Sequence, residues 1–137
     1  MELNKIYNED CLETMFKMPN DFVDYSLTSP PYNVGNNDLQ GLGKKYASYY
    51  PNSFDDKLPE EVYFENQKKI IQELLRVTKY HLFYNIQMLS NNKRNVLKLM
   101  GYFNEQIKDV LIWEKKAPTP AMEPGIVTGK QVIFSYS

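Results

Sequence analysis

The run Thr28-Ser29-Pro30-Pro31-Tyr32 combines residue types that could do chemistry. Its serine offers a hydroxyl, its tyrosine offers an aromatic face, and its two prolines lack a backbone N–H and have fixed φ angles. The residues before it are rich in β-formers and predict a buried strand that ends at the turn. Because open α/β sheets bind ligands at the carboxyl ends of their strands, the turn is a candidate for an active-site rim. The same run could also form an ordinary turn or a polyproline segment.

The chain before the turn predicts one strand and one helix. Residues 3–8 are expected to form a short strand. Asp10 then stands where a helix N-cap should be, with Glu13 in a capping-box-like position. One face of this helix would be apolar, lined by Leu12, Met15 and Phe16.

The chain after the turn predicts a long loop and then a helix and a strand. Residues 33–58 show no clear period, and loops of this length in compact domains are usually functional or disordered. Pro59 favours a helix start, and a broad apolar face that includes Tyr63 runs to about Thr78. Residues 80–86 predict a buried strand, parallel to the strand before the turn and reached by a right-handed crossover.

The last third of the chain predicts a helix between strands. Ser90 can cap this helix and Gly101 can stop it, with an inward face made by Val96, Leu97 and Met100. Two further strands are expected at residues 107–113 and 131–136, joined by a Pro/Gly-rich loop. Residues 1–137 therefore read as one α/β domain without repeats or linkers.

Composition excludes several classes of protein. With 137 residues, 42% hydrophobic and 14% aromatic, the chain can build one core. It has no membrane-length apolar run and no signal-peptide pattern, so we expect a cytoplasmic protein without membrane contact. A single Cys11 and a single His81 predict neither a disulfide nor a metal site. The net charge of -1 requires any nucleic-acid binding to use a local patch, such as Lys44-Lys45, although paired lysines are commonly just solvated surface.

Longer segments around the turn resemble a known enzyme family. Residues 28–33, preceded by Lys5-Ile6-Tyr7-Asn8-Glu9-Asp10-Cys11-Leu12, resemble the opening of DNA methyltransferases that modify an exocyclic amine, N6 of adenine or N4 of cytosine. Residues 82–86 and 109–115 resemble the strand after the catalytic turn and the tryptophan-containing strand of that family. The order is that of the circularly permuted group, class β. The resemblance implies a partial Rossmann-like α/β fold, S-adenosylmethionine as methyl donor, DNA as substrate and a place in restriction-modification.

The resemblance also implies roles for individual residues. The catalytic turn would consist of Ser29, Pro30, Pro31 and Tyr32. Residues near the cofactor would be Asp10, Cys11 and Ser29. Contacts to the target base or the DNA would come from Tyr32, Asn33, Lys44 and Lys45. Asp10 could serve as a helix N-cap with or without such a contact, and Tyr84 and Trp113 could be plain core residues.

The chemistry of this reaction accounts for the residue types in the turn. An aromatic exocyclic amine is a poor nucleophile because its lone pair is delocalised into the ring. Acceptors on its N–H groups, here the Ser29 side chain and the Pro30 carbonyl, would draw the nitrogen towards a tetrahedral geometry. Tyr32 would stack on a base flipped out of the duplex, and the loop at 33–58 would help to admit or hold that nucleotide. Serine at the first motif position leans towards N4 of cytosine, and the methyl transfer needs no covalent enzyme intermediate.

One motif of the resembled family is missing from the sequence. Family members carry, after the last matched segment, a Phe-x-Gly-x-Gly turn that holds the methionine part of the cofactor, and then an acidic residue for its ribose. Neither is present, so we expect the cofactor-binding strands to be lacking and the strand before the turn to be an open edge. Residues 1–137 would then be an incomplete catalytic domain: a portion of a longer enzyme, a degenerate remnant or one half of a split protein.

Three functions remain open on the sequence. The first is an incomplete DNA amino-methyltransferase that works with a complementing C-terminal half or with a second copy through the sheet edge. The second is a catalytically inactive module of the same fold that binds nucleic acid or a partner. The third is a purely structural α/β fragment.

Overall fold

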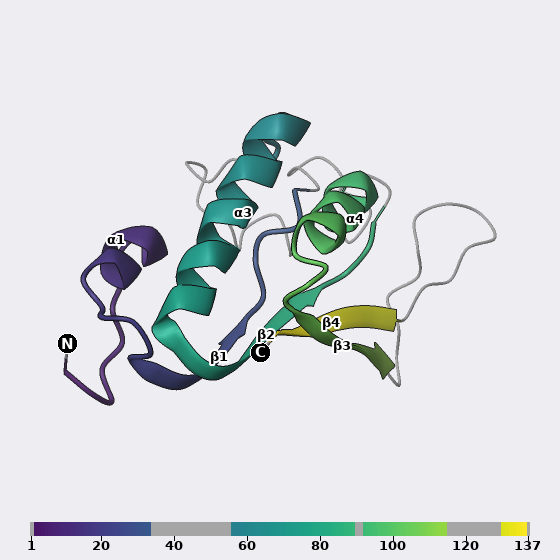
Figure 1. The fold of residues 1–137 in the computed structure, drawn as a ribbon. Helices are drawn as coiled ribbons and strands as arrows, with labels where there is room; N and C mark the ends of the chain where they lie inside the picture. The colour runs from purple at the N-terminus through teal and green to yellow at the C-terminus, as the bar shows by residue number, and fades with distance from the viewer. Residues whose placement is uncertain (1, 34–55, 90–91, 115–129, 137) are drawn as a thin grey trace.

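The computed structural model describes residues 2–33, 56–89, 92–114 and, as backbone, the strand at 130–136. The chain begins with helix α1 (Cys11–Phe16) and strand β1 (Val23–Thr28). Helix α3 (Glu60–Val77) leads directly into strand β2 (Thr78–Ile86). Helix α4 (Lys93–Tyr102), strand β3 (Ile107–Glu114) and strand β4 (Lys130–Tyr136) complete the described elements (Figure 1).

The four strands form one mixed sheet in the order β1-β2-β4-β3. β1 and β2 are parallel, with Thr28 opposite Tyr84. This confirms the parallel strand–helix–strand unit expected from the sequence. β4 is antiparallel to both β2 and β3.

Helices α3 and α4 lie on the same side of the sheet, and the core fills the space between (Figure 1). Alternate residues of β2 point into this core, which is why Leu82, Tyr84 and Ile86 are almost fully buried. They pack with a cluster from the two helices and the turn after α4: Ile71, Val96, Leu99 and Phe103. Tyr84 therefore has the core position expected as an alternative, whereas Trp113 on β3 is half exposed.

The prediction of a strand at residues 3–8 is wrong. This segment carries no strand, Ile6 is 96% exposed, and Asn4 has a φ of 59°, which turns the chain instead of extending it. None of the four described strands pairs with this segment, so the short apolar pattern gains no strand hydrogen bonds from them.

The strand before the turn forms as expected, but it is not buried. β1 is an edge strand bonded only to β2 among the described elements. Tyr25 and Leu27, which face away from the helices, are 61% and 78% exposed. The expected open edge at β1 is confirmed for the described part of the chain.

Three details of the predicted helices are also corrected. Phe16 lies at the last turn of the short helix α1 and is exposed. Leu97 is exposed because it follows the buried Val96 by one residue, which places it about 100° further round the helix. Gly101 does not end α4: the helix continues to Tyr102, and the buried Phe103 donates its backbone N–H to the Leu99 carbonyl.

Candidate active site at the carboxyl end of β1

The Ser-Pro-Pro-Tyr turn begins immediately after β1 ends at Thr28. Because β1 and β2 run parallel, the turn lies at the carboxyl edge of that pair, the edge where α/β sheets bind ligands. Pro30 is buried and anchors the turn, while Ser29 and Pro31 are exposed. Tyr32 is partly buried and packs against the hydrophobic core.

The hydroxyls of Ser29 and Tyr32 meet across the two prolines. Ser29 Oγ lies 3.3 Å from Tyr32 Oη, a distance at which either hydroxyl can donate to the other. The turn therefore brings a hydrogen-bonding group and an aromatic ring together at the surface. These are the two functions that the sequence assigned to this run.

Tyr63, near the amino end of α3, is hydrogen-bonded to the turn. Its hydroxyl donates a hydrogen bond of 2.7 Å to the Pro31 carbonyl, and its side chain is 2% exposed. Burial, together with the nearby Asp56 and Tyr32, raises the pKa of Tyr63 above its ordinary value. The hydroxyl is thereby kept in the protonated form that can donate.

Asn33, the residue after the turn, is hydrogen-bonded to the segment that precedes α3. Its side-chain Nδ2 donates to the Leu58 carbonyl at 3.0 Å, and its Oδ1 accepts from the Leu58 N–H at 2.7 Å. Its own backbone N–H donates to Asp56 Oδ1 at 2.9 Å. Asn33 has a left-handed φ of 58°, a conformation that asparagine tolerates better than most residues. Both of its amide atoms are thus engaged inside the protein.

Asp10 and Cys11, two of the three expected cofactor contacts, lie at the start of α1, whereas Ser29 lies in the turn. Asp10 is the N-cap, with Oδ1 accepting from the Leu12 N–H at 2.8 Å, which confirms the cap expected from the sequence. Partial burial of the thiol, followed by the charge of Asp10, raises the pKa of Cys11. Cys11 is therefore a neutral thiol near neutral pH.

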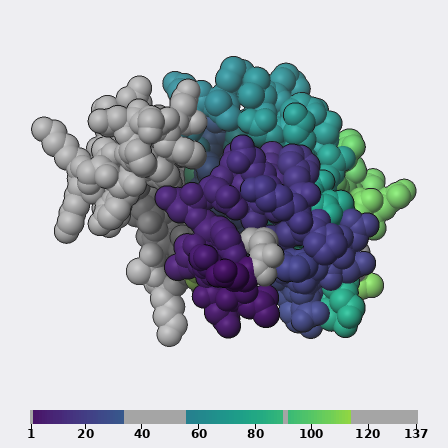
Figure 2. All heavy atoms as spheres, turned by 90° about the vertical axis from the view of Figure 1, so that its left-hand side faces the viewer, coloured from purple at the N-terminus to yellow at the C-terminus, as the bar shows by residue number. Residues whose placement is uncertain are grey.

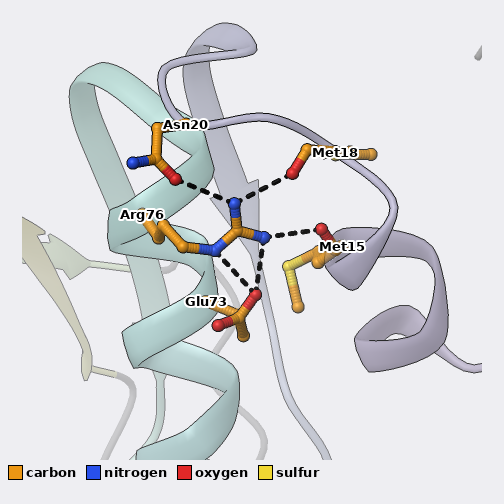
Figure 3. Close-up of polar contacts among 5 residues, drawn as sticks. All are labelled: Met15, Met18, Asn20, Glu73 and Arg76. Atoms are coloured by element: carbon orange, nitrogen blue, oxygen red, sulfur yellow. Dashed lines mark hydrogen bonds and ion pairs between the residues drawn. The ribbon is translucent and has the colours of Figure 1, made fainter.

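Arg76, near the carboxyl end of α3, fixes α1 in place (Figure 3). Its guanidinium donates to the carbonyl oxygens of Met15 at 2.7 Å and Met18 at 2.9 Å, and to Asn20 Oδ1 at 3.0 Å. Glu73, one turn earlier on α3, forms an ion pair of 2.7 Å with the same group. Figure 2 shows α1 at the surface beside α3. Arg76 thus adds a charged donor to the carbonyls of Met15 at the end of α1 and of Met18 just after it.

The two groups of predicted site residues meet opposite ends of α3. The turn contacts Tyr63, and α1 contacts Arg76; at a rise of about 1.5 Å per residue these two positions lie about 20 Å apart along the helix. Within the described ranges, no hydrogen bond joins Asp10 or Cys11 to the turn. Lys44 and Lys45, and residues 34–55 of the expected long loop, lie outside the described residues.

Sequence reasoning did not identify Tyr63, Asp56 or Arg76 as parts of the site. Tyr63 was placed on the apolar face of its helix, which is correct, but its hydroxyl needs a buried partner. Arg76 lies beside apolar residues in the last turn of its helix, and a guanidinium in such a place needs several hydrogen-bond acceptors. This pattern could have indicated that Arg76 binds other segments of the chain. In the portion described, no three potential metal ligands cluster, and no helix is long and apolar enough to span a membrane.

Comparison with known proteins gives concordant results. A DNA methylase family model, for N6 and N4 methyltransferases, matches residues 23–137. The type II methyltransferase M.BglII of Bacillus subtilis is 36% identical over 78 residues, which are 56% of this chain and 17% of that protein.

Two solved structures share the fold. The cytosine-N4-specific PvuII DNA methyltransferase superposes with a TM-score of 0.67 at 11% identity, over 96% of this chain and 48% of that one. A candidate DNA modification methylase from Thermus thermophilus gives 0.52 at 17% identity, over 91% of this chain and 48% of its own. These likenesses confirm the expected partial Rossmann-like α/β fold. The chain spans about half the length of these structures.

Proposed function

Because this chain belongs to the DNA methylase family whose model matches residues 23–137, we propose that it forms the target-base side of a DNA amino-methyltransferase. The reaction would methylate N4 of cytosine or N6 of adenine, as in restriction-modification. The observation that carries the proposal is the Ser29–Tyr32 turn, placed at the carboxyl end of β1 and held there by Tyr63. Residues 1–137 would act as one incomplete catalytic domain.

The turn residues take complementary roles in this proposal. Ser29 Oγ and the Pro30 carbonyl accept hydrogen bonds from the target amine and raise its nucleophilicity. The amine nitrogen would form a bond to the methyl carbon as the methyl–sulfur bond of the donor breaks and its electron pair stays on the sulfur, and the methylated amine would then release a proton to water. The Tyr32 ring stacks on the flipped base. The exposure of Ser29 and the proximity of its hydroxyl to that of Tyr32 support this arrangement.

S-adenosylmethionine would supply the methyl group when bound. Asp10 is exposed and uses Oδ1 to cap α1. A carboxylate has about four lone-pair sites, so the same side chain can cap the helix and accept a hydrogen bond from the cofactor. The neutral thiol of Cys11 adds a small apolar surface beside it. These residues fit one part of a cofactor site, and we propose them for that part alone.

The remaining part of the cofactor site would come from polypeptide that pairs with this chain. The open edge of β1 and the exposed Tyr25 and Leu27 support that idea, since an edge strand with apolar side chains is ready to pair with another strand. We propose a complementing C-terminal half as this partner and DNA as the substrate.

The stacking role of Tyr32 provides the test of this function. In the full protein, supplied with a cofactor-binding half if needed, Tyr32→Ala should weaken binding to duplex DNA about tenfold, because base–aromatic stacking contributes about 1–3 kcal/mol. Binding of S-adenosylmethionine, followed by calorimetry, should change by no more than about twofold. Fluorescence of 2-aminopurine at the target position would report base flipping directly.

Tyr80→Ala is the matched control for this experiment. Tyr80 is a half-exposed tyrosine near the amino end of β2, whereas the turn lies at the carboxyl end of the parallel pair. It should leave the 2-aminopurine signal unchanged. Equal loss of DNA and cofactor binding in Tyr32→Ala would argue against stacking. DNA binding without any methyl transfer, even with the second half present, would favour the inactive module.

A further inference from the structure

We infer that Tyr63 and Asn33 are positioning residues, which hold the Ser29–Tyr32 turn in one conformation before any base arrives. The inference rests on the proposed function, because it concerns the same turn. It also gives Asn33 a different role from the DNA contact that the family resemblance implied. Two independent sets of hydrogen bonds carry it, one on each side of Tyr32.

The first set fixes the carbonyl that follows the proposed acceptor. Tyr63 Oη donates to the Pro31 carbonyl at 2.7 Å, from a side chain that is 2% exposed. Only φ and ψ of Pro31 separate this carbonyl from the Pro30 carbonyl, and the proline ring fixes φ. Once Tyr63 holds the Pro31 carbonyl, a single rotation is left between that carbonyl and the group proposed to accept from the target amine. The hydrogen bond therefore orients Pro30 without touching the base.

The second set fixes the chain that leaves the turn. The Asn33 amide pairs with both backbone groups of Leu58, and the Asn33 N–H binds Asp56. An asparagine side chain used in this way imitates a backbone partner. Asn33 and Asp56 are 8% and 5% exposed, so these bonds are shielded from water. Residues 33 and 56, which flank the segment expected to admit the nucleotide, are thus held side by side.

The two sets meet at the first turn of α3. Leu58 lies two residues before the start of the helix, and Tyr63 lies in its first turns. Helix α3 therefore contains the donor to Pro31, and the segment that Asn33 binds directly precedes this helix. A site supported by a regular element in this way is preorganised, and groups that need no rearrangement during the reaction stabilise its transition state most effectively.

Amide hydrogen exchange of the unliganded 137-residue chain tests the inference without any reaction. Tyr63→Phe removes one hydroxyl and keeps the ring. The variant loses the buried hydrogen bond from Tyr63 to the Pro31 carbonyl, which frees the neighbouring chain to open. We therefore expect the Asn33 N–H, which bonds to Asp56, to exchange about tenfold faster. Asn33→Gly keeps the left-handed backbone and removes the amide, so the Leu58 N–H should exchange faster by a similar factor.

Tyr84→Phe is the matched control. Tyr84 is a buried tyrosine on β2, opposite Thr28, and its hydroxyl bonds to Gln67 Oε1 on α3 at 2.8 Å. It should leave the Asn33 N–H within about twofold of the unmodified chain. Equal exchange at Asn33 in the Tyr63→Phe and Tyr84→Phe variants would overturn the role of Tyr63. Unchanged exchange at Leu58 in Asn33→Gly, together with weaker DNA binding, would restore Asn33 to a DNA contact.

A kinetic measurement then separates positioning from general stability. In the full protein, Tyr63→Phe should lower kcat about tenfold and leave KM for S-adenosylmethionine within about twofold, since Tyr63 orients the Pro30 carbonyl, which acts on the amine. A rise in that KM with unchanged kcat would contradict the inference. If the unmodified protein transfers no methyl group, the proposed function fails, while the exchange data still decide whether Tyr63 and Asn33 hold the turn.

Discussion

At the residue scale, the site depends on a buried tyrosine that must remain a hydrogen-bond donor. Tyr63 is buried and lies near the negative charge of Asp56, and both raise its pKa. A phenolate at this position would face the Pro31 carbonyl oxygen and repel it. The same burial that fixes the turn therefore also protects the proton that makes the hydrogen bond.

This pKa shift predicts a pH dependence of stability. The folded pKa of Tyr63 is raised above the ordinary value of 10.0, so the unfolded chain loses this proton first as the pH rises. The stabilisation is fully present below that value and is lost as the pH increases above it. Near pH 8, Tyr63→Phe should lower the free energy of unfolding by about 1–2 kcal/mol, and the difference should shrink near about pH 10.5.

Urea unfolding of the two proteins at both pH values measures this difference. The other tyrosines are common to both proteins, so their ionisation cancels in the comparison. A difference in unfolding free energy that stays constant or grows with pH would contradict the raised pKa of Tyr63.

The sequence predicted residue roles where the interaction is local. The Asp10 cap could be read directly, because its partner Leu12 is two residues away. The Tyr63 hydroxyl and the Asn33 amide bind groups 32 and 25 residues away, so no spacing rule could have paired them. The family pattern implies a DNA contact for Asn33; its burial depends on Asp56 and Leu58, which no local pattern connects with it.

At the element scale, α3 organises both halves of the candidate site. Its amino end carries Tyr63 and meets the turn, and its carboxyl end carries Arg76 and meets α1. Arg76 also accepts, through its backbone carbonyl, the N–H of Asp21 just before β1. Helix α3 thus sets the positions of α1 and of the strand that leads into the turn.

Replacing Arg76 by methionine should detach α1 from α3. The variant keeps a long apolar chain but leaves Glu73 and the carbonyls of Met15 and Met18 without the guanidinium. We expect the free energy of unfolding to fall by about 2–3 kcal/mol, because hydrogen bonds to charged groups contribute about 1.5–3 kcal/mol each and these are partly exposed. Urea unfolding monitored by circular dichroism measures the loss.

Two further variants make this experiment specific. Arg94→Met removes an arginine from the exposed face of α4 and should change stability by no more than about 0.5 kcal/mol. Arg76→Lys keeps the charge but cannot reach all the acceptors with one ammonium group, so its stability should be intermediate. Equal stability of the Arg76→Met and Arg94→Met proteins would show that Arg76 does not hold α1.

Elements were predictable where packing supports the local pattern. The β1–α3–β2 unit was recovered because its helix has a long apolar face and its second strand is central. Residues 3–8 have a similar short apolar pattern but none of the described strands pairs with them, and the strand does not form. The end of α4 differs by one residue from the position expected from Gly101, because the helix continues to Tyr102 and the Phe103 N–H still bonds to the Leu99 carbonyl.

At the scale of the whole molecule, the described helices that pack on the sheet all lie on one of its two faces. α3 and α4 lie on that face (Figure 1). The opposite face presents exposed apolar side chains of β1 and β3: Tyr25, Leu27, Leu111 and Trp113. The solved structures that share the fold are about twice as long as this chain. Exposed apolar side chains beside a strand that is at the edge of the described sheet favour association with further polypeptide.

This arrangement predicts that the purified 137-residue chain self-associates through β1. Leu27 is 78% exposed on the edge strand, so Leu27→Lys places a charge where another strand would pair and costs little in the monomer. Sedimentation velocity over a range of concentrations should show association of the unmodified chain and a largely monomeric Leu27→Lys variant. Leu97→Lys, on the exposed side of α4, should associate like the unmodified chain. A cooperative, strictly monomeric chain that is saturable by S-adenosylmethionine would contradict both this prediction and the proposed complementing half, since the edge and the cofactor site would then need no partner.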